Sequence, residues 1–323
     1  MKMAILGAGG IAKKMAATIQ EIPEVEAYAV ASRSLEKAER FAREHGFKKA
    51  YGSYEEMVRD EAVDLVYVAT PHSHHLEHGK LCAAYGKNML VEKAFTQNAG
   101  QAKELLELAK EKKVLAAEAI WTRYMPSRQM LLDIMESGII GEICSLHATL
   151  SYPVAQVERI RRPELAGGAL LDLGVYPLNF AFMAFGDDVE KIDASAVLAE
   201  TGVDMAANMT LTYRDGKVAS LFCDARVADN REGAIYGDKG YIMVQNINNC
   251  EMIRVYNDDH ALLKEASVPA QITGYEYEVY ACMEALQKGE LECPQMPHKD
   301  IIRVMEVMDE IRAKVGVIYP NER

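Results

Sequence analysis

Three side chains in this sequence have types and spacing suited to taking a proton from a hydroxyl group. Asp172 and Tyr176 are four residues apart in a stretch that begins with two glycines and continues with helical character, so one helical face carries both. A tyrosine accepts such a proton when a nearby cation stabilises its phenolate, and Lys93 is the candidate cation. Spacing alone equally fits an amphipathic core tyrosine and a solvated lysine, so both interpretations stay open here.

A glycine-rich turn near the N-terminus predicts a binding site for the pyrophosphate of a dinucleotide. The segment 5–12 reads Ile-Leu-Gly-Ala-Gly-Gly-Ile-Ala between a predicted strand and a predicted helix. Gly7 suits a tight turn, Gly9 lets the backbone approach the anion, and Ala12 permits close helix–strand packing. The helix N-terminus then favours negative charge. The predicted contacts of this turn are Gly7, Gly9, Gly10, Ile11 and Ala12.

The end of the second predicted strand indicates NADP rather than NAD as the cofactor. In this fold an acidic residue at that position binds the ribose hydroxyls and repels a 2′-phosphate. Here the chain instead has Ser32, Arg33 and Ser34, and the first carboxylate, Glu36, is expected in the following helix. The guanidinium of Arg33 is suited to a bidentate contact with phosphate. We therefore expect NADP, with NAD as the alternative.

Alternating short apolar runs and amphipathic segments predict a parallel sheet covered by helices in the first part of the chain. Glu92 and Lys93 end one of these strands, at the carboxyl edge where such sheets bind ligands. The predicted dinucleotide-binding domain covers residues 1–120. Its expected strands are 3–6, 25–31, 65–69, 89–92 and 114–117, and its clearest helix is 97–112.

The second part of the chain changes to an alternation of period two, which predicts a half-buried antiparallel sheet within an α+β domain over residues 121–323. Asp215-Gly216 lies between two alternating runs and predicts a hairpin. Gly237 to Gly240 predicts a second tight turn. Two apolar stripes predict terminal helices, one with Tyr277, Tyr280 and Ala281, the other with Ile301, Val304, Met305, Met308 and Ile311.

Composition restricts the classes of protein to consider. The chain has 323 residues, a net charge of −12 and 50% hydrophobic residues, which favours a folded two-domain protein and disfavours nucleic-acid or anionic-membrane partners. We expect no membrane-spanning segment, because no apolar run approaches the roughly 18 residues needed, and we recognise no signal peptide. Six dispersed cysteines predict free, mostly buried thiols, and the cytoplasm is the expected location.

Several of these segments together resemble the Gfo/Idh/MocA oxidoreductases. The similarity covers nearly the whole chain, and the segment 118–126 is similar to the branch of dimeric dihydrodiol dehydrogenases, which also oxidise aldoses with NADP. The landmarks are residues 7–12, 69–75, 92–93 and 168–176.

The resemblance implies a Rossmann domain followed by an α+β domain with an open, mainly antiparallel sheet. It implies that Lys93 and Tyr176 form the catalytic pair with Asp172 beside them. Implied cofactor or substrate contacts are Ser32, Arg33, Thr70, Pro71, His72, His75, Glu92, Lys93, Trp121 and Arg123. The family's Glu-Lys-Pro is here Glu92-Lys93-Ala94, which leaves Lys93 less constrained.

The expected activity is hydride transfer between NADP and a hydroxyl carbon of a small sugar or cyclic diol. Two alternatives of the same architecture are a non-catalytic sugar sensor and an NAD-dependent glycosidase. We expect no metal site, because the histidines His72, His74 and His75 lack a matching carboxylate or thiolate cluster. A homodimer or higher homo-oligomer is expected through the sheet around residues 205–226, since the alternation leaves both faces with apolar residues such as Met209, Leu211, Leu221 and Phe222.

Overall fold

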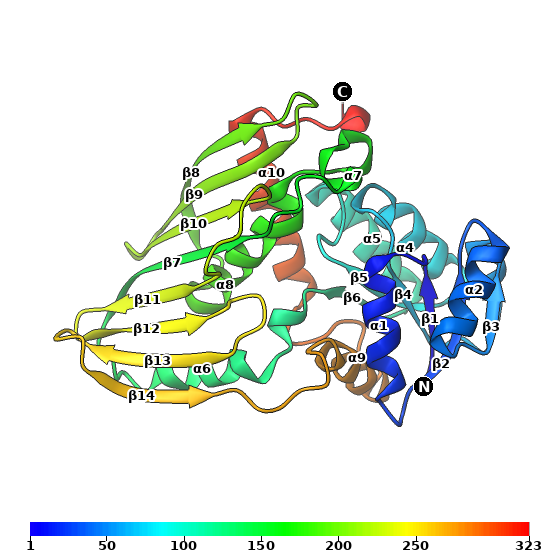
Figure 1. The fold of residues 1–323 in the computed structure, drawn as a ribbon, viewed down its shortest axis with the longest axis horizontal. Helices are drawn as coiled ribbons and strands as arrows, with labels where there is room; N and C mark the ends of the chain where they lie inside the picture. Colours follow the sequence, from blue (N-terminus) through cyan, green and yellow to red (C-terminus); the bar gives the residue numbers. More distant parts are fainter. Residues whose placement is uncertain (323) are drawn as a thin grey trace. The chain divides into compact units, whose positions relative to one another are not determined.

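The computed structural model in Figure 1 describes residues 1–322 and divides into two compact units. The first unit contains Met1–Trp121 and Gln271–Ile302; the second contains Thr122–Ala270 and the chain from Arg303 onward. The boundary near residue 120 coincides with the end of the first segment. A single cut there leaves out Gln271–Ile302, which joins the first unit after a long excursion of the chain.

The first unit is built on a six-stranded sheet in the order β3-β2-β1-β4-β5-β6. Every pair in it is parallel. This is the strand order of the dinucleotide-binding fold, so the predicted fold class is confirmed for this unit. Each predicted strand overlaps an observed one, and only the short β3 lacked a sequence signal. The strands are β1 Lys2–Leu6, β2 Glu26–Ala31, β3 Lys49–Tyr51, β4 Leu65–Val68, β5 Asn88–Glu92 and β6 Ala116–Ala119.

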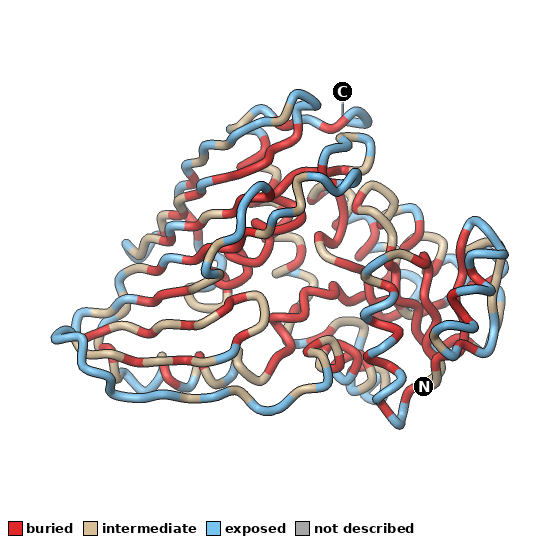
Figure 2. Tube along the Cα trace, viewed as in Figure 1, coloured by how far each residue is buried: buried red, intermediate tan, exposed pale blue. Residues whose placement is uncertain are grey.

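Helices connect these strands and cover a core that Figure 2 shows as nearly continuous buried chain along the sheet. Parallel strands buried on both faces read as unbroken apolar runs, as β4 does with Leu-Val-Tyr-Val. The helical segments of this unit are α1 Gly10–Gln20, α2 Leu35–His45, α3 Tyr54–Val58, η1 His72–His74, α4 His75–Ala84, α5 Ala99–Lys112 and α9 Glu276–Lys288.

The second unit contains an eight-stranded sheet in the order β14-β13-β12-β11-β7-β10-β9-β8. Its pairs are antiparallel except β7 with β10, so the mainly antiparallel sheet is confirmed. Asp215-Gly216 connects β9 to β10, and Gly237 pairs with Gly240 across the second turn. The strands are β7 Ile143–Ser151, β8 Val189–Leu198, β9 Asp204–Tyr213, β10 Val218–Asp224, β11 Gly233–Gly237, β12 Gly240–Gln245, β13 Met252–Asn257 and β14 Leu262–Ser267.

The two faces of this sheet differ in burial, and both carry apolar residues, as predicted. Met209 pairs with Leu221, and both are buried together with Leu211 on the face that packs in the core. Phe222 follows Leu221 in β10 and lies on the opposite face, because neighbouring residues of a strand point to opposite sides. Figure 2 shows the resulting alternation of buried and exposed chain along these strands.

A buried helix packs against the sheet inside the second unit. The stretch Pro163–Phe185 has a mean hydropathy of 1.4 and is long enough to span a membrane by length and composition, contrary to the expectation that no such run exists. Since 83% of its apolar window is buried inside the protein, it is a core helix. The helical segments that lie wholly in this unit are α6 Pro126–Glu136, α7 Glu158–Arg161, η3 Pro163–Leu165, η4 Leu170–Gly174, α8 Val175–Phe185 and η5 Pro320–Glu322, while η2 Trp121–Arg123 and α10 His298–Val315 cross the division between the units.

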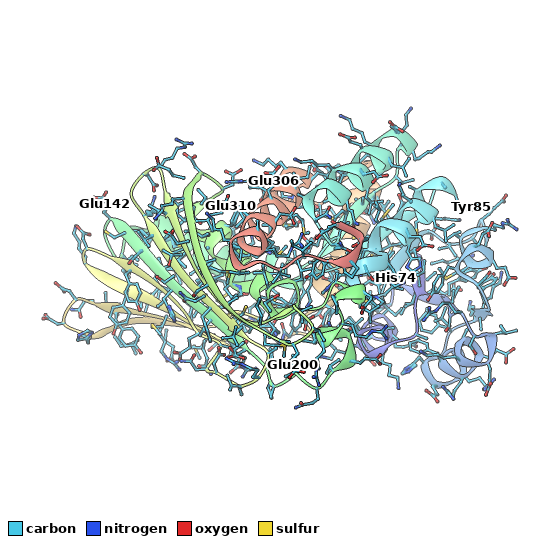
Figure 3. The ribbon with its side chains drawn as sticks, turned by 90° about the horizontal axis from the view of Figure 1, so that it is seen from above. His74, Tyr85, Glu142, Glu200, Glu306 and Glu310 are labelled. Atoms are coloured by element: carbon cyan, nitrogen blue, oxygen red, sulfur yellow. The ribbon has the colours of Figure 1, made fainter. Side chains whose placement is uncertain are left out.

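The predicted apolar stripe is confirmed in α10 but not in α9. All five residues of the α10 stripe are buried, and Glu306 and Glu310, labelled in Figure 3, lie on the more exposed side of this helix. In α9 the prediction is wrong, because Tyr280 is exposed whereas Glu278 is completely buried. A glutamate on the buried face of a helix breaks the pattern that a hydropathy argument follows.

The cysteines are as predicted. All six are free, and only Cys144 among them is exposed.

Candidate active site

The glycine-rich turn follows β1 and leads into α1 within the first unit. Gly7 has φ +105°, and a Cβ there would lie 2.9 Å from the main-chain oxygen of Ala69, so a side chain is excluded. A Cβ on Gly9 or Gly10 would meet no protein atom within 4 Å. No side chain caps α1 and no acidic residue occupies its first turn, so its N-terminal N–H groups face an open cradle suited to an anion.

The end of β2 carries a cation and no carboxylate. Ser32 is buried, Arg33 is exposed, and Ser34 caps α2 by accepting a hydrogen bond from the Lys37 N–H at 3.3 Å. Glu36 lies in the first turn of α2, as expected. Burial raises the pKa of Tyr54, and the nearby charge of Arg33 acts in the opposite direction. Burial lowers the pKa of His78 to about 4, and the charge of Arg33 adds a smaller effect in the same direction.

The segment after β4 is fixed by a buried histidine. His75 contacts the main-chain oxygens of Thr70 at 2.7 Å, of Ala94 at 2.9 Å and of Phe95 at 3.2 Å. Burial lowers the pKa of His75 to about 4, although these oxygens act in the opposite direction. His75 therefore links the chain after β4 to the chain after β5. Pro71, His72 and His74 lie in this segment, and Figure 3 labels His74.

Lys93 follows directly after β5, at the carboxyl edge of the parallel sheet. Its side chain is half-buried, and its main-chain oxygen accepts a hydrogen bond from His72 Nε2 at 3.2 Å. The peptide bond between Lys93 and Ala94 is cis.

The residue before Lys93 belongs to a buried cluster of carboxyl groups. Glu92 accepts a hydrogen bond from the Tyr67 hydroxyl, and Glu118 accepts one from the Phe95 N–H at 2.9 Å. Glu278 of α9 is 0% exposed, and neither of its carboxyl oxygens has a hydrogen-bond partner among the described residues. Burial, with the nearby charge of Glu92 next in importance, raises the pKa of Glu278 well above its usual value. We infer that Glu278 is a neutral carboxylic acid in the folded protein.

This burial makes stability depend on pH, and Glu278→Gln tests it. Because the folded-state pKa lies above the unfolded value, the wild type loses stability as pH rises above that unfolded value, by up to about 1.4 kcal/mol per pH unit. Glutamine cannot ionise. We expect Glu278→Gln to raise the thermal unfolding midpoint at pH 8, with a gain that shrinks towards pH 5.

Glu284→Gln on the same helix is the matched control. Glu284 is solvent-exposed and paired with Lys288, so its replacement should change stability little at either pH. An equal shift of the Glu278→Gln midpoint at pH 5 and pH 8 would contradict the assignment of a neutral buried acid.

Trp121 and Arg123 are both buried, each within its own unit. Trp121 stacks on Tyr275 with ring centroids 4.2 Å apart. Arg123 donates from Nε to Asn179 Oδ1 at 2.8 Å, and the Asn179 amide donates to the main-chain oxygen of Val175, also at 2.8 Å. Arg123 is thereby connected to α8 one turn beyond Tyr176.

Asp172 and Tyr176 lie on one continuous helical path in the second unit, but it begins as a π-helix. Asp172 lies in η4, and Tyr176 is the second residue of α8. Both side chains are largely buried. Arg159 of α7 makes two hydrogen bonds to the Asp172 carboxylate, at 2.8 and 3.2 Å, so this acid belongs to a bidentate ion pair.

Comparison with known proteins gives a consistent result. Residues 1–119 match the family model "Oxidoreductase family, NAD-binding Rossmann fold", and residues 129–243 match the "GFO/IDH/MocA C-terminal domain". A human trans-1,2-dihydrobenzene-1,2-diol dehydrogenase is 32% identical over 331 residues, covering 100% of this chain and 99% of the relative. The corresponding enzyme of Xenopus laevis is 33% identical, covering 99% of each. The chain belongs to the Gfo/Idh/MocA oxidoreductase family.

Solved structures agree with this membership. A 3-ketoreductase from Actinomadura kijaniata, in complex with NADP and TDP-benzene, superimposes with a TM-score of 0.90 at 26% identity over 98% of both chains. The predicted family, two-part fold and oxidoreductase class are therefore confirmed. As a Gfo/Idh/MocA protein, this chain uses a nicotinamide dinucleotide in its first unit.

Within each unit, several residues that contact the predicted site residues or their neighbours had no recognisable sequence signal. Arg159 pairs with Asp172, Asp204 hydrogen-bonds the main chain before Asp172, and Asn179 holds Arg123. Glu278 reaches the cluster around Glu92 from a remote helix. A charged residue in an apolar stretch, as at Asp204 and Glu278, is the one pattern that points to such positions.

Proposed function

We propose that this protein is an NADP-dependent dehydrogenase or reductase that acts on a CH–OH group of an aldose or a cyclic trans-diol. The observation that carries the proposal is the full-length similarity, at 32% identity, to a trans-1,2-dihydrobenzene-1,2-diol dehydrogenase. The NADP complex of the similar 3-ketoreductase supports the choice of cofactor.

The residues of the first unit fit NADP. The uncapped start of α1 and the open space over Gly9 and Gly10 suit a pyrophosphate. Arg33, exposed at the end of β2, suits the 2′-phosphate, and Thr70, Pro71 and His72 follow the neighbouring strand β4. When bound, the nicotinamide supplies the hydride acceptor.

We assign the proton to residues of this chain. Oxidation of a hydroxyl carbon to a carbonyl releases one hydride and one proton, and we propose that the Tyr176 phenolate takes this proton and becomes the neutral hydroxyl. Lys93 supplies the positive charge that favours the phenolate. The Asp172 carboxylate is neutralised by Arg159, so we assign it to holding this segment rather than to proton transfer.

A substrate panel tests the activity. We expect steady-state formation of NADPH from NADP with at least one free aldose, inositol or cyclic trans-diol, or its reversal with the matching carbonyl compound. Release of an aglycone from a glycoside without net change in cofactor would identify a glycosidase instead. Sugar binding without turnover would identify a sensor.

We further propose a homodimer formed through the outer face of the second unit's sheet. This face carries Phe222 and an aromatic row in which Tyr236 is 40% exposed and Tyr241 stacks on Tyr256 at 5.0 Å. A wide face with aromatic side chains is typical of an interface.

Light scattering tests the dimer. At micromolar concentration we expect twice the monomer mass, and we expect Tyr241→Asp to give monomers because it would bury an unpaired charge in the interface. Tyr280→Asp, at an exposed position of α9, is the control and should leave the mass unchanged. A wild-type monomer would refute this assembly. The thiols are all free, which fits the cytoplasm as the proposed location.

A further inference from the structure

The segment that carries Asp172 and Tyr176 begins at two glycines held by residues from distant parts of the second unit. The first oxygen of the Asp204 side chain would lie 2.2 Å from a Cβ on Gly168, whose φ is +119°, so the carboxylate packs directly on bare backbone. Its second oxygen accepts a hydrogen bond from the Leu170 N–H at 2.6 Å. Leu170 is the first residue of η4, so Asp204 holds the start of this π-helical turn.

A second contact holds the same glycines from the C-terminal part of the chain. The Tyr319 hydroxyl donates to the main-chain oxygen of Gly167 at 2.7 Å, and Tyr319 is 1% exposed. The Arg312 guanidinium lies 4.7 Å from the Tyr319 ring centroid and is paired with Asp309 and Glu322. The start of the turn is therefore bound on one side by a carboxylate and on the other by a phenol.

The carboxyl group of Asp204 is itself almost completely enclosed, at 1% exposure. The titratable groups that face it are Tyr319 and Arg312 from the C-terminal part and Cys223 from β10. Arg312 is the cation among them and already makes its own ion pairs. The short hydrogen bond from the Leu170 N–H is made to one carboxylate oxygen, while the other has no hydrogen-bond partner among the described residues. A hydrogen bond to a buried, ionised carboxylate fixes a backbone position strongly.

We propose that Asp204 is a positioning residue for proton transfer. Its ionised carboxylate fixes the start of η4, and through this turn the orientation of Asp172 and Tyr176. The inference rests on the proposed function, because it gives Asp204 a role in a reaction assigned to Tyr176. Loss of the charge should lower turnover while leaving the proposed NADP contacts of the first unit, at the glycine-rich turn and Arg33, unchanged.

The pKa of Asp204 lies within the pH range over which kcat can be measured. Burial raises the pKa of Asp204 to about 6, while the main-chain hydrogen bond from Leu170 and the charge of Arg312 act in the opposite direction. Below that pH the neutral acid binds the Leu170 N–H more weakly. The wild type should therefore lose the contribution of Asp204 to kcat as pH falls through about 6.

The experiment compares kcat of the wild type and Asp204→Asn from pH 5 to pH 9, using the best substrate of the panel. Asparagine keeps an acceptor oxygen and the size of the side chain but not the charge. We expect kcat of the variant to be roughly 10- to 100-fold lower at pH 8, as for a displaced reacting group. The two rates should converge below pH 6, and the Kd for NADP should not change.

Two further variants keep the test decisive. Tyr319→Phe removes the other contact and should lower kcat by a factor that does not depend on pH between 5 and 9. Asp188→Asn, at an exposed position before β8 paired with Arg214, is the control and should behave as wild type. If Asp204→Asn folds poorly, a wild-type kcat that does not fall as pH is lowered through about 6 would overturn the proposal.

A ratio of wild-type to Asp204→Asn rates that stays constant with pH would also overturn it, since that pattern indicates a merely structural role. Failure of the proposed function would look different. In that case Tyr176→Phe would leave turnover intact, whatever Asp204→Asn does.

Discussion

Lys93→Met and Tyr176→Phe each lower kcat by roughly 10² to 10⁴, about 3 to 5 kcal/mol of activation free energy, while the Kd for NADP stays close to the wild-type value. The reason is that each replacement removes a group proposed to support proton transfer, not a contact with the dinucleotide. Lys93 directly follows β5 at the ligand-binding edge of the parallel sheet, and Tyr176 lies at the start of α8. Single-turnover rates and NADP titrations measure the two properties separately.

Lys110→Met and Tyr280→Phe are matched controls for this pair. Both residues are exposed, on α5 and α9 respectively, and their replacement should leave kcat unchanged. Weaker NADP binding with full turnover at saturating cofactor would contradict the proposed roles of Lys93 and Tyr176.

Arg33→Ala weakens binding of NADP much more than binding of NAD. A hydrogen-bonded contact with a charged group contributes roughly 1.5 to 3 kcal/mol, so the ratio of the two dissociation constants should change by about 10- to 150-fold. Arg33 is exposed beyond β2, and the nearest carboxylate along the chain, Glu36, already belongs to α2. No acidic group therefore stands at the position that selects NAD in this fold.

Arg40→Ala controls for the general loss of a positive charge near the cofactor. Arg40 is an exposed residue of α2, and its removal should change the two dissociation constants by similar, small factors. Equal weakening of NADP and NAD by Arg33→Ala, or a wild-type preference for NAD, would show that Arg33 does not bind the 2′-phosphate.

The sequence was most informative where structure depends on neighbouring residues. The turn at Gly7, the end of β2 before Ser32 and the hairpin at Asp215-Gly216 follow from local backbone requirements and alternation of side chains, and the structure confirms them. The apolar stripe of α10 was equally clear, because all of its members face the core.

The parts that could not be predicted depend on contacts between distant residues. Nothing local indicates that Gln271–Ile302 joins the first unit, that Glu278 is buried on α9, or that Asp204 binds the backbone of Leu170. A hydropathy pattern places such carboxylates on the surface, because it takes no account of contacts between residues that are far apart in the sequence. The Asp172 ion pair was missed for the same reason, since Arg159 alone resembles any surface arginine.

Transfer of a deuterium label tests the central claim most directly. The best substrate of the panel is prepared with deuterium on the hydroxyl-bearing carbon and incubated with the protein and NADP, and the reduced cofactor is analysed by mass spectrometry. We predict that NADPH gains one deuterium for each carbonyl product formed, because the hydride moves directly from that carbon to the nicotinamide. Reduced cofactor without the label, or product without reduced cofactor, would contradict the account.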